Sequence, residues 1–128
     1  MVSPVLNERF YPGAFLISEA NGFRSRDTAL VKNPGGTELV LEAGLVMASL
    51  TADASLVPYD NVGTDGSEVA SCILYGGAVI PAGGQKRVTI VARDAEVNAA
   101  ELRWDPAVDA AGRAAGLVDL ATRGLIGR

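Results

Sequence analysis

The sequence contains no histidine, a single cysteine, only seven aromatic residues (three Phe, three Tyr, one Trp) and no long apolar run. Without histidine the chain lacks the commonest general base, the usual zinc ligand and the Ser–His and Cys–His nucleophile pairs. Hydrolytic chemistry would therefore have to use carboxylates or lysine. Because Cys72 is the only cysteine, one chain can form neither an internal disulfide nor a cluster of several thiolates.

Hydrophobic residues are interrupted well before the roughly 18 needed to cross a bilayer, so we expect no membrane partner. The first residues, MVSPV, show no basic segment followed by a long apolar run. We therefore expect no secretory signal, and synthesis in the cytoplasm. The charge of the chain also argues against binding to nucleic acid, because 11 Lys and Arg and 15 Asp and Glu give a net charge of -4. Binding to phosphates requires clustered cations, so we expect no direct nucleic-acid partner.

What the chain does contain is glycine and proline, at 15 and 6 of 128 residues, within a composition that is 48% hydrophobic. This length suits one core rather than two ordinary domains. Abundant turn formers with few aromatic residues favour many short strands over a helical bundle. We predict a mainly β fold with a C-terminal helix, of the α+β class, built as a small barrel or sandwich of short strands.

Short apolar or β-branched runs separated by turn residues mark the expected strands. The turn signals are Asn21-Gly22, the NPGG segment at 33–36, Asp65-Gly66 and two Gly-Gly pairs. The expected strands are 14–18, 28–31, 38–41, 43–48, 57–59, 69–75, 78–82 and 87–92, followed by a link at 94–98 and a short final strand within 124–128.

A helix is predicted near 107–123, with Pro106 in its first turn and Gly124 ending it. Its expected apolar face is formed by Val108, Ala111, Ala115, Val118 and Ala121, with Leu117 widening it. Gly112 and Gly116 lower its intrinsic stability by roughly 1 kcal/mol each relative to alanine, so the helix is expected to depend on docking against the sheet.

Residues 1–13, the first part of the N-terminal arm 1–18, combine two prolines with aromatic side chains and have no regular period. Exposed aromatic side chains are costly, so either a neighbouring chain covers this arm or the arm folds back onto its own barrel. Farther along, Leu102 and Trp104 stand at strand spacing. They are expected in the core, where Trp104 would anchor the helix, or at a subunit contact.

Three carboxylates define an alternative from another functional class. Asp94 and Glu96 lie two residues apart at a strand end, and Glu101 follows. Such groups can bind a divalent cation or divide acid and base roles, which would make the chain a small carboxylate-dependent metal-binding domain or enzyme. A solvated turn without a ligand is the favoured interpretation of these residues, since no third carboxylate stands at the spacing of a calcium loop. A β-barrel module for a small ligand is a third possibility, and it predicts a monomer with an interior cavity.

Several segments together resemble a known family. They are RVTIVAR at 87–93, DAEVN at 94–98, LRW at 102–104, the alanine-rich helix, GLIGR at 124–128, DGSEVASCILY at 65–75 and AFLISE at 14–19. In this combination they resemble the head decoration proteins of tailed bacteriophages, related to the lambda decoration protein D. The resemblance covers most of the chain.

The resemblance implies a non-enzymatic cement protein, without cofactor or metal, made in the bacterial cytoplasm and carried on the outer surface of the virion. It implies a homotrimer that binds the major capsid protein at three-fold positions of the expanded head and stabilises it. We divide the chain accordingly into an arm at 1–18 and a decoration-protein β domain at 19–128. The candidate capsid-binding residues are Arg9, Phe10, Tyr11, Phe15, Leu16 and Ile17, and the candidate core or trimer-interface residues are Leu102 and Trp104.

Overall fold

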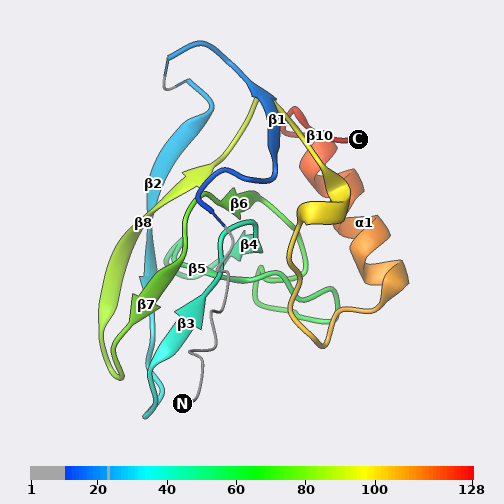
Figure 1. The fold of residues 1–128 in the computed structure, drawn as a ribbon. Helices are drawn as coiled ribbons and strands as arrows, with labels where there is room; N and C mark the ends of the chain where they lie inside the picture. Colours follow the sequence, from blue (N-terminus) through cyan, green and yellow to red (C-terminus); the bar gives the residue numbers. More distant parts are fainter. Residues whose placement is uncertain (1–10, 23) are drawn as a thin grey trace, which may run out of the picture.

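The computed structural model describes residues 11–22 and 24–128. These residues form ten β-strands, one 3₁₀ helix and one α-helix, which confirms the mainly β fold with a C-terminal helix (Figure 1). In chain order the elements are β1 (Leu16–Glu19), β2 (Arg26–Lys32), β3 (Leu39–Leu41), β4 (Val46–Ser49), β5 (Leu56–Pro58), β6 (Cys72–Leu74), β7 (Ala78–Ile80), β8 (Gln85–Val91), β9 (Ala95–Val97), η1 (Ala99–Glu101), α1 (Ala110–Ala121) and β10 (Leu125–Gly127).

Five strands close into a barrel in the order β2-β5-β4-β6-β8. Its longest ladder is antiparallel and joins β2 to β8, while β2 and β5 meet in parallel through Val31 and Leu56 alone. A closed barrel leaves none of its strands with a free edge. One of the two cores fills it: Val31, Leu41, Leu45, Met47, Leu56, Cys72, Leu74, Ala78, Ile80, Val88 and Ile90.

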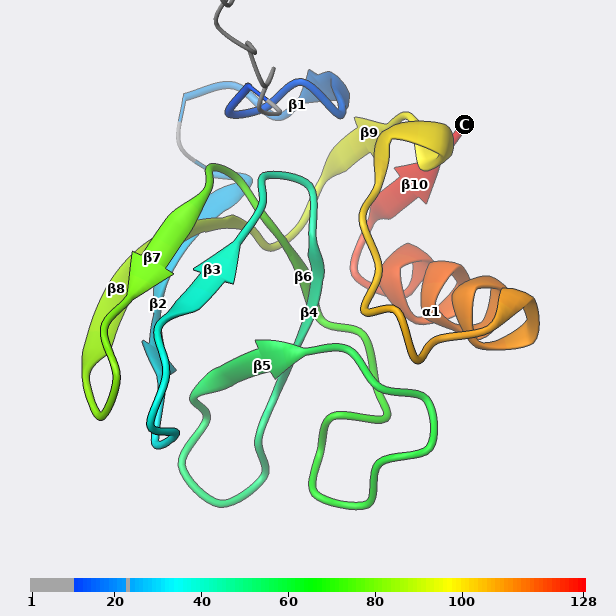
Figure 2. The ribbon, with the colours of Figure 1, turned by 60° about the horizontal axis from the view of Figure 1, so that its bottom comes forward.

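A second layer lies on one side of the barrel, where Figure 2 shows β9, β10 and α1 together. Strand β9 is central: it pairs antiparallel with β1 and parallel with β10. This layer has its own core, which includes Phe15, Tyr59, Val97 and Leu120. Strands β3 and β7 form a separate two-stranded sheet. In the described part of the chain, no helix is long and apolar enough to cross a membrane.

Strand β9 is the element that the sequence analysis missed, because 94–98 was expected to be a link. Three residues between a turn and a polar segment give little periodicity on which to base a strand. The strand forms because both of its neighbours come from distant parts of the chain: Ala95 faces Glu19 on β1 and Leu125 on β10. Asp94 makes the preceding turn with a φ of 53°.

The helix is shorter than the predicted 107–123 and begins after Pro106 rather than with it. Asp109 caps α1, since its carboxylate accepts a hydrogen bond from the Gly112 amide at 2.8 Å. A side-chain oxygen at this position satisfies one of the unpaired amides of the first turn and so fixes where the helix starts. Gly124, with a φ of 78°, follows the end of the helix.

The buried face of the helix also differs from the prediction. Gly112, Gly116 and Leu120 are buried, whereas Val118 is 66% exposed, and Ala111, Ala115 and Ala121 are exposed too. The reason is close approach. A Cβ atom on Gly116 would lie 2.7 Å from the Trp104 ring, and one on Gly112 would lie 2.5 Å from Asn61. The glycines therefore let the helix dock, although they weaken it as an isolated helix.

Candidate functional site

The N-terminal segment enters the fold at residues 13–16, which we call the arm root. The Gly13 amide donates to the Tyr75 carbonyl at 2.9 Å, and the Asn98 amide donates to the Phe15 carbonyl at 2.8 Å. Gly13 has a φ of 72°, and a Cβ atom there would lie 2.8 Å from the Tyr75 ring. Glycine is thus required at this position both by the backbone conformation and by the close contact.

The six candidate capsid-binding residues fall into three groups. Arg9 and Phe10 lie outside the described residues. Tyr11 and Ile17 are 76% and 55% exposed and are available to a partner. Phe15 is only 2% exposed and packs in the domain's own core, with Leu16 packed partly against that core. The apolar area of Phe15 is already buried within the chain, so Phe15 could contact a capsid only if this segment left the core.

The arm also becomes part of the fold earlier than the boundary expected between residues 18 and 19. Strand β1 spans that boundary and pairs with β9, with a bulge between Leu16 and Ser18. Residues 13–18 cannot leave the domain without breaking these bonds. Without unfolding the domain, a partner can therefore engage only the residues before the arm root and the side chains that β1 leaves exposed, such as Ile17.

A polar cluster around Glu19 connects the end of β1 to the barrel. Arg26 donates to Glu19 from two nitrogens, at 2.6 and 3.1 Å, and the buried Ser25 hydroxyl donates to the same carboxylate at 2.6 Å. The guanidinium of Arg26 also lies over the Tyr75 ring, 4.1 Å from its centroid. The hydrogen bonds from Arg26 and then Ser25 lower the pKa of Glu19. These contacts fix the position of β1 relative to the barrel.

The outer face of the sheet β1-β9-β10 is exposed beside the arm root. The Glu96 carboxylate is central to it, accepting from Arg128 Nε at 2.8 Å and from the Ser18 hydroxyl at 3.1 Å. These bonds, the one from Arg128 first, lower the pKa of Glu96. Exposed Ile126 pairs with Glu96 across the ladder, and Ile17 lies in the β1 bulge. Ile17 is among the candidate capsid-binding residues, whereas Ile126 and Arg128 are not, although the alternation within GLIGR is a signal for them.

The three carboxylates of the alternative hypothesis have different surroundings. Asp94 lies 3.6 Å from Arg24, Glu96 is held by Arg128, and Glu101 is exposed at the end of η1. Among residues 11–22 and 24–128, no three His, Cys, Asp or Glu side chains are grouped so that they could hold a metal ion. The described structure does not bring these carboxylates together as a site.

Leu102 and Trp104 lie beneath the helix. Leu102 is buried, and Trp104 is half-buried with its ring 5.9 Å from that of Tyr59 in an edge-on arrangement. The Tyr59 hydroxyl in turn donates to the Gly112 carbonyl at 2.9 Å. Trp104 and Tyr59 thus connect α1 to the second core, and the exposed part of Trp104 remains open to a contact.

Comparison with known proteins agrees with this arrangement. A search of the curated proteins finds none that matches this sequence. The family model described as bacteriophage lambda head decoration protein D matches residues 5–125, a span that includes the arm root, the barrel, the helix and the second sheet up to the first residue of β10. The chain therefore belongs to the bacteriophage lambda head decoration protein D family.

Proposed function

We propose that this protein is a capsid cement protein. Three copies form a trimer that binds the outside of the expanded head at three-fold positions, and the bound trimer stabilises the shell by linking neighbouring subunits of the major capsid protein. No catalytic step is needed, because the function lies in surfaces. The observation that carries this proposal is the family match, which spans residues 5–125 and implies a place on the phage capsid.

The surface that we assign to the capsid is the segment before the arm root, which includes Tyr11, together with Ile17 just after it. Tyr11 and Ile17 are exposed apolar side chains at the point where the chain enters the domain. Burying one such side chain fully contributes on the order of 1.5 to 3 kcal/mol, before the cost of ordering the segment. Phe15 adds nothing to this sum because the domain already buries it.

Symmetry makes weak contacts sufficient. In a trimer the second and third contacts become intramolecular, which raises the overall affinity by roughly 10² to 10⁴ without any new type of contact. An extended arm can also add a strand to an exposed sheet edge of the capsid, so that main-chain hydrogen bonds contribute affinity. Stabilisation of the head follows by linkage, since a protein that binds only the expanded shell favours that state.

Co-sedimentation with expanded, undecorated capsids of the same phage tests the proposal. The full-length protein is expected to bind saturably, and a variant lacking residues 1–10 is expected to lose most of this binding. The deletion stops before Gly13, so the hydrogen bonds that the described residues make at the arm root are retained. Thermal unfolding can confirm that the domain stays folded. Failure of the full-length protein to bind would refute the proposed function. Unchanged binding by the truncated variant would place the contact elsewhere.

Decoration is also expected to raise the temperature at which expanded capsids disassemble, in proportion to occupancy. Light scattering during heating measures this directly. A saturating amount of bound protein that leaves the disassembly temperature unchanged would contradict the cementing role while leaving decoration itself intact.

A further inference from the structure

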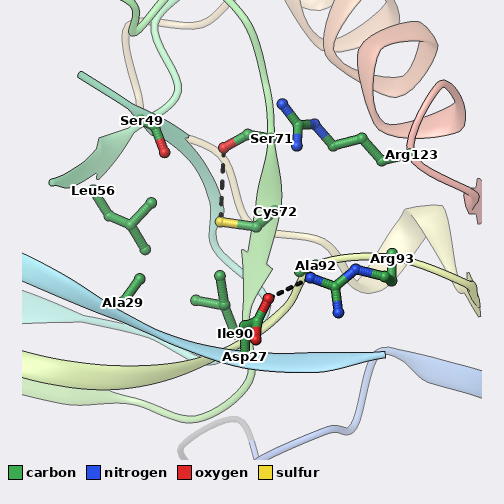
Figure 3. A pocket seen from close by; sticks show the side chains of 10 residues that line it. All are labelled: Asp27, Ala29, Ser49, Leu56, Ser71, Cys72, Ile90, Ala92, Arg93 and Arg123. Atoms are coloured by element: carbon green, nitrogen blue, oxygen red, sulfur yellow. Dashed lines mark hydrogen bonds and ion pairs between the residues drawn. The ribbon is translucent and has the colours of Figure 1, made fainter. Parts of the chain in front are cut away.

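One end of the barrel holds a cavity of about 370 Å³ (Figure 3). All five barrel strands contribute to its walls, together with residues that flank them and one residue after the helix. The lining residues are Asp27, Ala29, Ser49, Leu56, Ser71, Cys72, Ile90, Ala92, Arg93 and Arg123. Its size falls at the small end of the range of pockets that bind ligands.

The walls nearest the barrel core are apolar. They are formed by Ala29 on β2, Leu56 on β5, Cys72 on β6 and Ile90 on β8. Cys72 behaves as part of this apolar surface, because burial raises the pKa of its thiol to about 11 and keeps it protonated at neutral pH. This part of the cavity suits an aliphatic group rather than an ion.

The rim is polar and carries an excess positive charge. Arg93 is engaged, since it pairs with Asp27 and donates to the Arg24 carbonyl at 2.7 Å. Arg123 is different: it is exposed, and its side chain makes no ion pair or hydrogen bond with any residue of the described structure. Figure 3 shows its guanidinium group extending from the helix end toward Ser71. Among the described residues, the rim therefore offers a guanidinium that has no ion-pair or hydrogen-bond partner and that is directed toward a hydroxyl.

Two guanidinium groups and one carboxylate leave the lining with a charge of +1, in a chain whose net charge is -4. The net negative charge of the protein repels an anionic partner, whereas the positive charge of the cavity lining attracts it, so that binding is directed to the cavity. Arginine binds carboxylates through paired hydrogen bonds, and the apolar residues on the barrel side of the cavity offer contact to an aliphatic group next to such a carboxylate.

We propose that the barrel-end cavity binds an apolar group bearing a carboxylate, with the aliphatic part against Leu56 and Ile90 and the carboxylate on Arg123. The source to which we commit is a peptide segment of the capsid protein, either a chain end or an acidic residue beside an aliphatic one. The choice of capsid as the source rests on the proposed function. The carboxylate-binding property of the cavity does not.

The property itself is tested by titrating the full-length, isotopically labelled protein with N-acetylleucine and following backbone amide signals. We expect shifts at the cavity-lining strands, and weaker binding of the neutral N-acetylleucinamide. Arg123→Gln is expected to weaken N-acetylleucine binding by about tenfold, equivalent to about 1.4 kcal/mol. Arg113→Gln is the matched control, because Arg113, on α1, is exposed like Arg123 but does not line the cavity, and its replacement removes the same charge. Equal binding of the two probes, an unchanged Arg123→Gln, or no shifts at the cavity would overturn the proposal.

Capsid co-sedimentation and a lipid-like probe identify the source. Arg123→Gln is expected to bind expanded capsids less tightly than the wild type, while Arg113→Gln binds equally well. If octanoate binds the cavity at least tenfold more tightly than N-acetylleucine and Arg123→Gln leaves capsid binding unchanged, the peptide assignment is overturned in favour of a lipid-like carboxylate. If the wild type does not bind capsids, the proposed function fails, and the probe titration still decides whether the cavity binds carboxylates.

Discussion

Replacement of Gly116 by alanine tests the docking of the helix most directly. In an isolated helix this change is favourable by about 1 kcal/mol. Here the new Cβ atom would lie 2.7 Å from the Trp104 ring and 3.0 Å from the Tyr59 ring. Neither ring can move freely, because they contact each other and Tyr59 donates to the Gly112 carbonyl.

Overpacking of this kind costs about 1 to 3 kcal/mol. After subtraction of the propensity gain, Gly116→Ala is expected to destabilise the protein by about 1 kcal/mol, which lowers the Tm by roughly 4 °C for a domain of this size. Thermal unfolding at a fixed protein concentration measures the shift, since association makes Tm depend on concentration.

A second variant separates steric crowding from other causes. In a Trp104→Ala background the nearest obstacle is gone, so Gly116→Ala is expected to become neutral or stabilising, and the double-mutant cycle should show a coupling above 0.5 kcal/mol. A Gly116→Ala variant that is more stable than the wild type would refute the close packing of the helix. A destabilisation that persists unchanged without Trp104 would refute its assigned cause.

Further predictions concern the arm root, the acid sensitivity and the thiol. Gly13→Ala should lower the free energy of unfolding by about 1 to 2 kcal/mol because of the left-handed backbone conformation, and by a further amount because of the clash with Tyr75. Gly22, with a φ of 68° and no atom within 4 Å of the added Cβ, is the control: Gly22→Ala should show the conformational cost alone. Denaturant unfolding measures both. Because its folded-state pKa is lowered, Glu19 contributes stability that is present above its unfolded pKa of about 4.5 and is lost as pH falls through the folded value. Glu19→Gln should flatten the fall of Tm below about pH 5, and an equal fall in both proteins would contradict this. Because burial raises the pKa of its thiol, Cys72 should react with iodoacetamide at pH 8 about a hundredfold more slowly in the folded than in the unfolded protein. A reaction rate that does not change with denaturant would show that the thiol is not buried.

The helix shows that a periodic pattern can predict the element correctly and its buried face wrongly. The period of Ala111, Ala115 and Val118 predicted a helix, and the helix is there. Hydrophobicity alone assigned that stripe to the core, yet the chain buries Gly112 and Gly116 instead, because removing side chains brings the backbone closer to Tyr59 and Trp104. Periodicity reports that a helix has two faces, but it cannot report the shape of the surface that the helix meets.

The candidate site divides in the same way. Exposure of Tyr11 and burial of Phe15 depend on where β1 pairs, and no local signal in residues 11–19 distinguishes the two aromatic residues. Similarly, the residues of the barrel-end cavity are spread from Asp27 to Arg123, so only closure of the barrel brings them together.

By itself the sequence determined the fold class, the turn positions, the presence of a C-terminal helix and the family. All of these follow from local composition, short-range periodicity or motifs along the chain. Tertiary structure alone decided that β9 is a strand, that the glycine face of the helix is the buried one, and that Arg123, which pairs with none of the described residues, lies at the rim of the barrel-end cavity. These features arise from contacts between residues far apart in sequence, whose energies are not encoded in any single segment.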